Sequence, residues 1–344
     1  MFFTPSGSSF YGKCAVSAQG GWLPGISFPK HFEQPPEDFV QINKFSPSWI
    51  GKYFFECYII HCIKNINFIG EFFDMNPTLI TSAQNNGIKH LVRLRERRER
   101  EKEKLTVLEG YRELTRADEY GMTITEAWFS PELFLGENEY PLLAHLEAKG
   151  AKLFQVPPHL LTKVTYRDRP EGLIAVAKML KHDLSSIPIR PDGLYLLAES
   201  IEKPGNLGSM LRSADAAGAD GLIICDRQTD IYNPNVIRAS TGALFSVPLA
   251  ETDNESALAW LKENNILSIA TTPHTDKCYT DIDMTGPVAI IMGTEQTGLT
   301  DFWLQKADVS AVIPMLGKID SLNVATATTI LLYEAARQRN FKKR

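Results

Sequence analysis

The chain has 344 residues, of which 44% are hydrophobic and 22% are charged. This length and composition are ordinary for a globular protein with two domains, each with its own core. The net charge of -5 at pH 7 argues against a uniformly basic nucleic-acid-binding protein, but it leaves room for a local basic face.

Neither a disulfide framework, a metal site nor a membrane span is predicted. The five cysteines are odd in number and irregularly spaced, which favours a reducing compartment and hence a cytoplasmic protein. Cys57, His61 and Cys62 lie close together, but no second ligand pair follows at a spacing typical of zinc. The apolar residues 53–73 include three charged side chains, a density that is costly in a bilayer.

Residues 1–74 differ from the rest of the chain in being rich in Phe, Pro, Gly and Ser. We expect them to form a poorly ordered extension and assign them no function. The residues leave open a second interpretation, in which Met75 is the physiological start and the extension comes from an over-extended reading frame.

The segment 78–104 is predicted to contain a helix with Ser82 as its N-cap, followed by dense charge. Between Lys89 and Lys104 there are eight Lys or Arg and four Glu, a net charge of +4. One interpretation is a solvated helix face with Glu–Arg pairs four residues apart, and the other is a surface that contacts phosphates. The candidates for such contacts are Arg93, Arg95, Arg97 and Arg98, together with Arg238 farther along the chain.

Short strands alternate with helices after this segment, which predicts a small α/β domain over residues 75–165. A connector over 166–192 includes an apolar strand at 172–178. The domain over 193–344 alternates apolar strands with helices and predicts a mostly parallel sheet covered by helices.

Three loops in this last domain carry residues suited to a ligand. The first, Glu199–Arg212, lacks the third glycine of a dinucleotide fingerprint, so an NAD site is poorly supported. Asn206 could simply cap the following helix, whereas Arg212 lies off the apolar stripe of that helix.

The second and third loops also follow apolar strands. In Gly293–Leu299, two glycines bracket Glu295; this is either a turn with a solvated carboxylate or a place where a ligand approaches the backbone closely. The third loop enters the final helix through Ser321, Leu322 and Asn323, which places a hydroxyl and a carboxamide beside unpaired backbone N–H groups.

In this order, the motifs N-x-G-x-x-x-R, G-x-E-x-x-G-L and I-P-M followed by S-L-N-V resemble those of the SpoU (TrmH-like) RNA ribose 2′-O-methyltransferases, of the SPOUT class. The resemblance runs from Gly193 to Arg339. A weaker resemblance, to the N-terminal substrate-binding domain of the same family, covers Ile80 to Pro170. It is carried by Ser82, Gln84, Asn85, Lys89, Leu108, Glu109 and Gly110.

The resemblance implies a SPOUT-type parallel sheet with a trefoil knot, a homodimer formed through the C-terminal domain, and S-adenosyl-L-methionine as cofactor. It places the cofactor on backbone groups of Gly293, Ile313 and Leu322, with Thr271 or Thr272 nearby. It implies no metal.

For catalysis the resemblance points to Arg212, which would act on the ribose 2′-hydroxyl. Because the pKa of arginine lies above about 12, we expect Arg212 to bind a phosphate and stabilise the developing alkoxide in preference to acting as a base. The residues expected to orient it are Asn206, Glu295, Ser321 and Asn323.

The predicted substrate is rRNA, specifically 23S rRNA, with tRNA as the alternative. A non-catalytic RNA-binding protein of the same fold is a second alternative, which the presence of Arg212, Glu295, Ser321 and Asn323 together disfavours. A nucleotide-dependent oxidoreductase is the third, disfavoured by the absent glycine.

Overall fold

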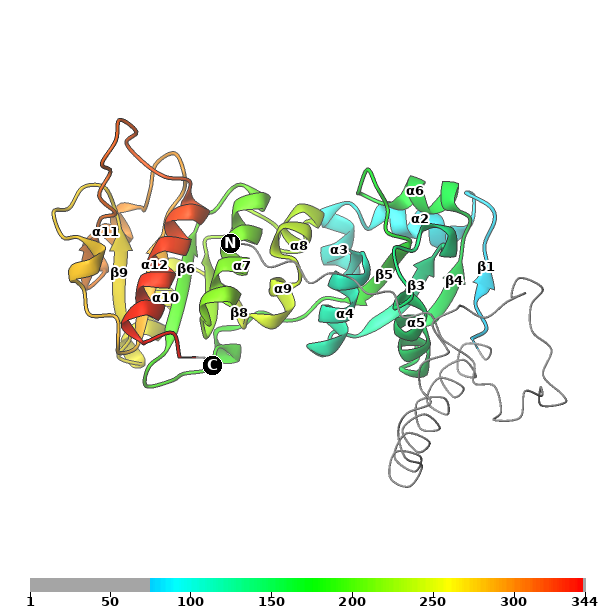
Figure 1. Cartoon of the computed structure of the whole chain (residues 1–344), viewed down its shortest axis with the longest axis horizontal. Coiled ribbons are helices and arrows are strands. Elements are labelled where there is room, and N and C mark those ends of the chain that lie inside the picture. The colour runs from blue at the N-terminus through cyan, green and yellow to red at the C-terminus, as the bar shows by residue number, and fades with distance from the viewer. Residues whose placement is uncertain (1–74, 343–344) are drawn as a thin grey trace, which may run out of the picture. The chain divides into compact units, whose positions relative to one another are not determined.

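The computed structural model describes residues 75–342, which fold around two β-sheets (Figure 1). The predicted extension 1–74, with Cys57, His61 and Cys62, lies outside the described residues. Within the part that is described, no helix is long and apolar enough to cross a bilayer, and no three metal-ligating side chains cluster.

The first sheet has five strands and belongs to the small domain. Its spatial order is β1 (Thr78–Leu79), β4 (Lys152–Gln155), β3 (Ile124–Phe129), β5 (Leu173–Lys178), β2 (Leu105–Glu109). The helices of this domain are α2 (Asn86–Arg93), α3 (Arg97–Glu103), α4 (Tyr111–Glu119), α5 (Glu139–Ala148) and α6 (Pro158–Val164).

The small domain extends beyond the boundary that we predicted at residue 165. The apolar strand at 172–178, which we placed in the connector, is β5, and it pairs antiparallel with both β2 and β3. It therefore lies inside the sheet, between two strands that precede it in the chain. A connection within 179–193 remains, with one short 3₁₀ turn at Leu184–Ser186.

The predicted N-cap Ser82 is wrong. Helix α2 begins at Asn86, and the cap is Asn85, whose Oδ1 accepts a hydrogen bond from the Gly87 N–H at 2.8 Å. The Ser82 hydroxyl instead accepts from the Gln84 N–H at 3.2 Å, in the turn before the helix. The first turn of the helix packs against Trp128, because a Cβ at Gly87 would lie 2.4 Å from that ring.

The second sheet has six strands, all parallel, and confirms the predicted parallel α/β architecture. The order is β11 (Val309–Ala311), β9 (Leu267–Thr271), β10 (Val288–Met292), β6 (Leu194–Glu199), β7 (Gly221–Cys225), β8 (Leu249–Thr252). The helices of this parallel-sheet domain are α7 (Pro204–Ala217), α8 (Pro234–Ser240), α9 (Ala243–Ser246), α10 (Asn254–Glu263), α11 (Asp301–Lys306) and α12 (Val324–Gln338).

Helices cover both faces of this sheet, so its strands are apolar throughout (Figure 1). The even-numbered residues of β6 pack in one cluster with α7 and α12, whereas Tyr195 and Leu197 pack with Trp260 and Trp303. The chain leaves β6 toward β7 and β8 on one side and later returns to β9, β10 and β11 on the other. Such a reversal of strand order opens a crevice at the carboxyl ends of the central strands, where α/β proteins bind ligands.

Candidate functional site at the carboxyl edge of the parallel sheet

The three loops singled out in the sequence follow β6, β10 and β11. Because all six strands are parallel, their carboxyl ends lie at one edge of the sheet, and the loops share that edge. Side chains from the three loops are in contact. The Asn206 Nδ2 donates to the Glu295 carboxylate, and the Asn323 Nδ2 donates to the Asn206 Oδ1 at 3.1 Å. The two bonds join residues that are 89 and 117 positions apart, and they form one chain of hydrogen bonds.

One interpretation of the sequence makes Asn206 the N-cap of helix α7, but Asn206 does not occupy that position. The cap position is Lys203, and Pro204 takes the first helical turn, where its missing N–H costs nothing. This leaves the Asn206 carboxamide free to face the other two loops. The Lys203 Nζ lies 4.0 Å from the Glu295 Oε2, so that carboxylate receives both an amide donor and a nearby cation.

The loop after β10 is closed by two backbone hydrogen bonds between Thr294 and Gly298, at 3.0 and 3.2 Å. A Cβ at Gly293 would lie 2.2 Å from the carbonyl carbon of Gly298, which no side chain can tolerate. Gly298 itself has a positive φ of 71°. Both glycines are therefore required by the turn, and the turn fixes Glu295 between them.

The last loop enters α12 as the sequence predicted. Asn323 is the N-cap, and its Oδ1 accepts from the Ala325 N–H at 3.0 Å while its Nδ2 reaches Asn206. Ser321 is exposed and makes no hydrogen bond within the described residues. Of the two polar residues predicted at this helix terminus, only Asn323 is held in place.

The backbone of this edge offers several unpaired groups. The N–H groups of Gly293, Ile313 and Leu322 have no acceptor among the residues that the structure describes. Thr271 and Thr272 are used differently, because the Thr271 hydroxyl donates to the Ile291 carbonyl at 2.7 Å and the Thr272 N–H donates to Ala311 at 3.0 Å. These bonds connect β9 to its neighbours β10 and β11. The unpaired N–H groups of Gly293, Ile313 and Leu322, by contrast, can donate hydrogen bonds to the polar edge of a nucleoside cofactor.

Arg212 lies on α7, six residues after Asn206, and is exposed. Its guanidinium makes no hydrogen bond or ion pair with any described residue. Its neighbour Ser213, by contrast, is hydrogen-bonded to Thr329 on α12 at 2.7 Å. The helix is thus anchored to α12 while Arg212 keeps its donors available.

Glu199 is a residue that the sequence reasoning missed. It is only 1% exposed, and its carboxylate accepts from the Thr300 N–H at 2.9 Å, the Thr300 hydroxyl at 2.6 Å and the Asn254 Nδ2 at 2.8 Å. Glu199 ends β6 and Thr300 caps α11, so the contact joins the first loop to the end of the second. The sequence does contain a signal for this residue, namely a carboxylate at the end of an otherwise apolar strand.

The buried carboxylate also affects its surroundings. Besides its bond to Glu199, the Asn254 Nδ2 donates to the Asp226 Oδ2 at 2.5 Å. The Asn254 Oδ1 accepts from the Trp303 ring N–H at 2.6 Å. Burial and the neighbouring Glu199 charge raise the pKa of Asp226. The hydrogen bonds of this network connect the ends of β6 and β7 with α10 and α11.

The predicted phosphate-contacting arginines of the small domain divide into two groups. Arg93 and Arg98 are exposed and unpaired within the described residues. Arg95 donates to the carbonyls of Lys163 and Thr165 at 3.0 and 2.7 Å, and Arg97 pairs with Glu101 at 2.8 Å. The solvated-face interpretation therefore accounts for Arg97, and internal bonding accounts for Arg95.

Two family models match the chain. The SpoU rRNA Methylase family model matches residues 193–333, and the model of the MRM3-like substrate binding domain matches residues 85–175. The 23S rRNA (uridine(2479)-2′-O)-methyltransferase of Streptomyces viridochromogenes is 34% identical over 236 residues, which are 67% of this chain and 82% of that protein. The Bacillus subtilis 23S rRNA (guanosine(2553)-2′-O)-methyltransferase RlmP is 29% identical, over 74% of this chain and 97% of its own.

Solved structures agree with these matches. The AdoMet-bound rRNA methyltransferase from Sinorhizobium meliloti superposes with a TM-score of 0.70 at 30% identity, covering 76% of this chain and 97% of that one. The SpoU methyltransferase AviRb from Streptomyces viridochromogenes, in complex with AdoMet, gives 0.67 at 32% identity, covering 76% and 100%.

Proposed function

The chain belongs to the SpoU rRNA methylase family, and we propose that it transfers a methyl group from S-adenosyl-L-methionine to a ribose 2′-hydroxyl of 23S rRNA. The observation that carries this function is the convergence of Asn206, Glu295 and Asn323 at one sheet edge, with Arg212 left unpaired on the adjoining helix. The relatives named for 23S rRNA favour that substrate over tRNA.

S-adenosyl-L-methionine fits the edge described above. The free N–H groups of Gly293, Ile313 and Leu322 would hold it, and the missing Cβ of Gly293 keeps the backbone within reach of a ligand. When bound, the cofactor supplies an electrophilic methyl group on a sulfonium. Thr271 and Thr272 would support this site indirectly, by fixing the strand ends that carry it.

Arg212 would act on the ribose. A guanidinium keeps its proton at any physiological pH, so Arg212 donates hydrogen bonds to the 2′-oxygen and an adjacent phosphate and does not accept the hydroxyl proton. Such donors stabilise the negative charge that develops on the 2′-oxygen as its proton leaves. Removal of one donor of this kind typically lowers kcat by about 10² to 10³.

Asn206, Glu295 and Asn323 would orient the three loops. Asn206 is hydrogen-bonded to both of the others, which would fix the ends of α7 and α12 relative to the turn after β10. Holding two reactants in the reactive geometry can contribute roughly 7 kcal/mol or more to lowering a barrier. Ser321, which has no partner among the described residues, is free to contact the RNA.

We further propose that the parallel-sheet domain carries the trefoil knot of its family and forms a homodimer in the cytoplasm. Leu316 and Ile319, in the loop between β11 and α12, are 97% and 62% exposed. Apolar side chains this exposed beside a candidate active site favour coverage by a second subunit. In the small domain, Arg93 and Arg98 would contact RNA phosphates.

The test is methyl transfer from labelled S-adenosyl-L-methionine to 23S rRNA transcribed in vitro, with tRNA as the competing substrate. We expect transfer to 23S rRNA, and we expect Arg212→Ala to reduce kcat by about 100-fold or more while calorimetry shows cofactor affinity nearly unchanged. Lys262→Gln, on the distant helix α10, is the charge-matched control. Wild-type turnover by Arg212→Ala would refute its assignment, and transfer to tRNA alone would overturn the substrate.

A further inference from the structure

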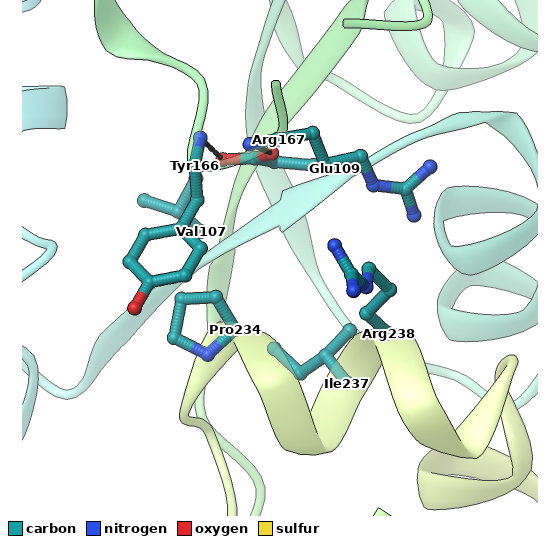
Figure 2. A pocket seen from close by; sticks show the side chains of 7 residues that line it. All are labelled: Val107, Glu109, Tyr166, Arg167, Pro234, Ile237 and Arg238. Atoms are coloured by element: carbon teal, nitrogen blue, oxygen red, sulfur yellow. Dashed lines mark hydrogen bonds between the residues drawn. The ribbon is translucent and has the colours of Figure 1, made fainter. Parts of the chain in front are cut away.

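A second set of arginines lies where the small domain meets α8 of the parallel-sheet domain. Figure 2 shows a pocket there, with Arg167 and Glu109 on one side and Arg238 of α8 on the other. The guanidinium of Arg238 points toward that of Arg167 (Figure 2). Both arginines, with Arg112 of α4, also line an adjoining cavity of about 480 Å³, here called the junction cavity. Its size is that of a typical small-ligand site.

Most charges around the junction cavity are already paired. Arg167 donates to Glu113 at 2.7 Å and to Glu171, so its charge is balanced by two carboxylates. A third carboxylate, Glu139, is buried, and its Oε1 accepts from the N–H groups of Leu135 and Gly136 at 3.1 and 3.2 Å. Glu113 and Glu171 therefore share Arg167 as their partner, whereas Glu139 is bonded through Oε1 alone and its buried Oε2 has no hydrogen-bond partner among the described residues.

Arg112 and Arg238 are the exceptions. Both are exposed, and neither makes a hydrogen bond or ion pair with any residue described in the structure. They come from different domains yet line the same cavity. Two unpaired guanidiniums lining one cavity are a suitable arrangement for an anion, because each can donate charge-assisted hydrogen bonds to phosphate oxygens.

We propose that the junction cavity binds one phosphate of the RNA backbone between Arg112 and Arg238. This inference rests on the proposed function, since it identifies a second point, apart from the reacting ribose, at which the enzyme binds its RNA substrate. Arg167 lines the same cavity, and its hydrogen bonds to Glu113 and Glu171 fix its guanidinium before the RNA arrives.

The position of Arg238 connects this phosphate to the reacting nucleotide. Helix α8 packs closely on α7 at Gly208. A Cβ added to this glycine would lie only 2.6 Å from the Ala239 Cβ and 2.7 Å from the Val236 carbonyl oxygen. Arg212 follows Gly208 by one helical turn. A phosphate bound by Arg238 is thus placed relative to Arg212 through two helices in direct contact, which makes the junction cavity a determinant of which ribose reaches Arg212.

The experiment measures binding of in vitro transcribed 23S rRNA at several KCl concentrations for wild type, Arg112→Gln, Arg238→Gln and the double variant. We expect each single substitution to weaken binding about 10-fold and to reduce the slope of log Kd against log salt by roughly 0.7 to 0.9. Because both side chains hold the same phosphate, the double variant should lower the slope no further than either single variant.

Lys262→Gln removes the same charge from α10 and should leave affinity and slope as in wild type. Unchanged binding of the Arg238 variant would overturn the proposal, as would slopes that add in the double variant, since these would indicate two separate phosphates. Calorimetry with inorganic phosphate alone is a further measurement. Saturable phosphate binding that Arg238→Gln abolishes, together with RNA binding that the same variant leaves unchanged, would assign the cavity to free phosphate in place of RNA.

The outcome separates this inference from the proposed function. Methyl transfer and cofactor binding are measured on the same proteins, and retained cofactor affinity shows that each variant is folded. If wild type methylates RNA and the arginine variants bind it normally, only the junction cavity is wrongly assigned. If wild type neither binds nor methylates 23S rRNA, both proposals are wrong.

Discussion

Arg212 and Glu199 differ in the candidate site in their exposure and in their hydrogen bonds. Arg212 is exposed and keeps its donors free, whereas Glu199 is 1% exposed and its carboxylate accepts three hydrogen bonds. The first is suited to act on an incoming substrate and the second to hold the loops behind it. Residue type alone separates them poorly, because both are charged side chains in the segment Glu199–Arg212.

Glu199→Gln tests the positioning role at the residue scale. The glutamine NH₂ cannot accept from Thr300 or Asn254, so at least one buried donor loses its partner, at a cost of about 1 to 3 kcal/mol in unfolding free energy. Urea unfolding measures this loss. Methyl transfer should also weaken, because Thr300 adjoins the loop that carries Glu295.

The control is Gln296→Ala, an exposed position in that same loop, which should change the unfolding free energy by no more than about 0.5 kcal/mol. A Glu199→Gln protein as stable and as active as wild type would show that the buried carboxylate does not position the loop.

The turn between β10 and α11 shows how an element shapes the site. Its backbone reverses between Thr294 and Gly298, and the two halves approach so closely that Gly293 has no room for a Cβ. A turn was one of the two interpretations of two glycines around an acid, and the structure adds the reason for the first glycine. That close approach also leaves the Gly293 N–H at the sheet edge with no partner among the described residues.

Gly293→Ala should therefore impair the cofactor site. The added Cβ would lie 2.2 Å from backbone at Gly298, so the turn must move. We expect the Kd for S-adenosyl-L-methionine to rise at least about 10-fold, equivalent to about 1.4 kcal/mol, in a protein that still unfolds cooperatively. Calorimetry provides the measurement.

Gly286→Ala is the matched control, because this glycine precedes the same strand and a Cβ there would meet nothing within 4 Å. Equal cofactor affinity in the two alanine variants would contradict a role for Gly293 at the binding edge.

The connection between the two domains carries a histidine whose titration makes the stability of the whole molecule depend on pH. His182, in the connection between them, is hydrogen-bonded to the buried Tyr232 hydroxyl at 2.9 Å, and the Leu180 N–H donates to the same oxygen at 2.9 Å. Burial lowers the pKa of His182 below its usual value near 6.5. The unfolded chain thus takes up a proton at a pH where the folded chain does not.

Stability should consequently fall as pH decreases from about 7 through the unfolded pKa near 6.5. Because the unfolded state binds more protons in this window, the unfolding free energy rises with pH, by up to about 1.4 kcal/mol per unit. Burial raises the pKa of Glu109, Glu113 and Glu251, which act in the opposite direction. The difference between wild type and His182→Gln isolates the histidine.

We expect that difference, measured by urea unfolding at a series of pH values, to shrink as pH falls from 7 toward 5. A constant difference across this range would mean that His182 titrates alike in the folded and unfolded chains.

Much of this protein followed from local patterns in the chain. Apolar strands alternating with helices predicted the parallel sheet, because strands covered on both faces must be apolar throughout. The motifs around Asn206, Glu295 and Asn323 singled out three loops whose side chains are in contact in the structure, since glycines, caps and polar residues after strands have local causes.

Only the tertiary structure decided what depends on contacts between distant residues. It distinguished Asn206 as a partner of Glu295 from Asn206 as a helix cap, moved the cap of α2 from Ser82 to Asn85, and placed the strand at 173–178 inside the small sheet. It also paired Arg95 internally while leaving Arg112 and Arg238 free on one cavity. Sequence patterns report periodicity and local conformation, whereas the partner of a polar side chain depends on which segments the fold brings together.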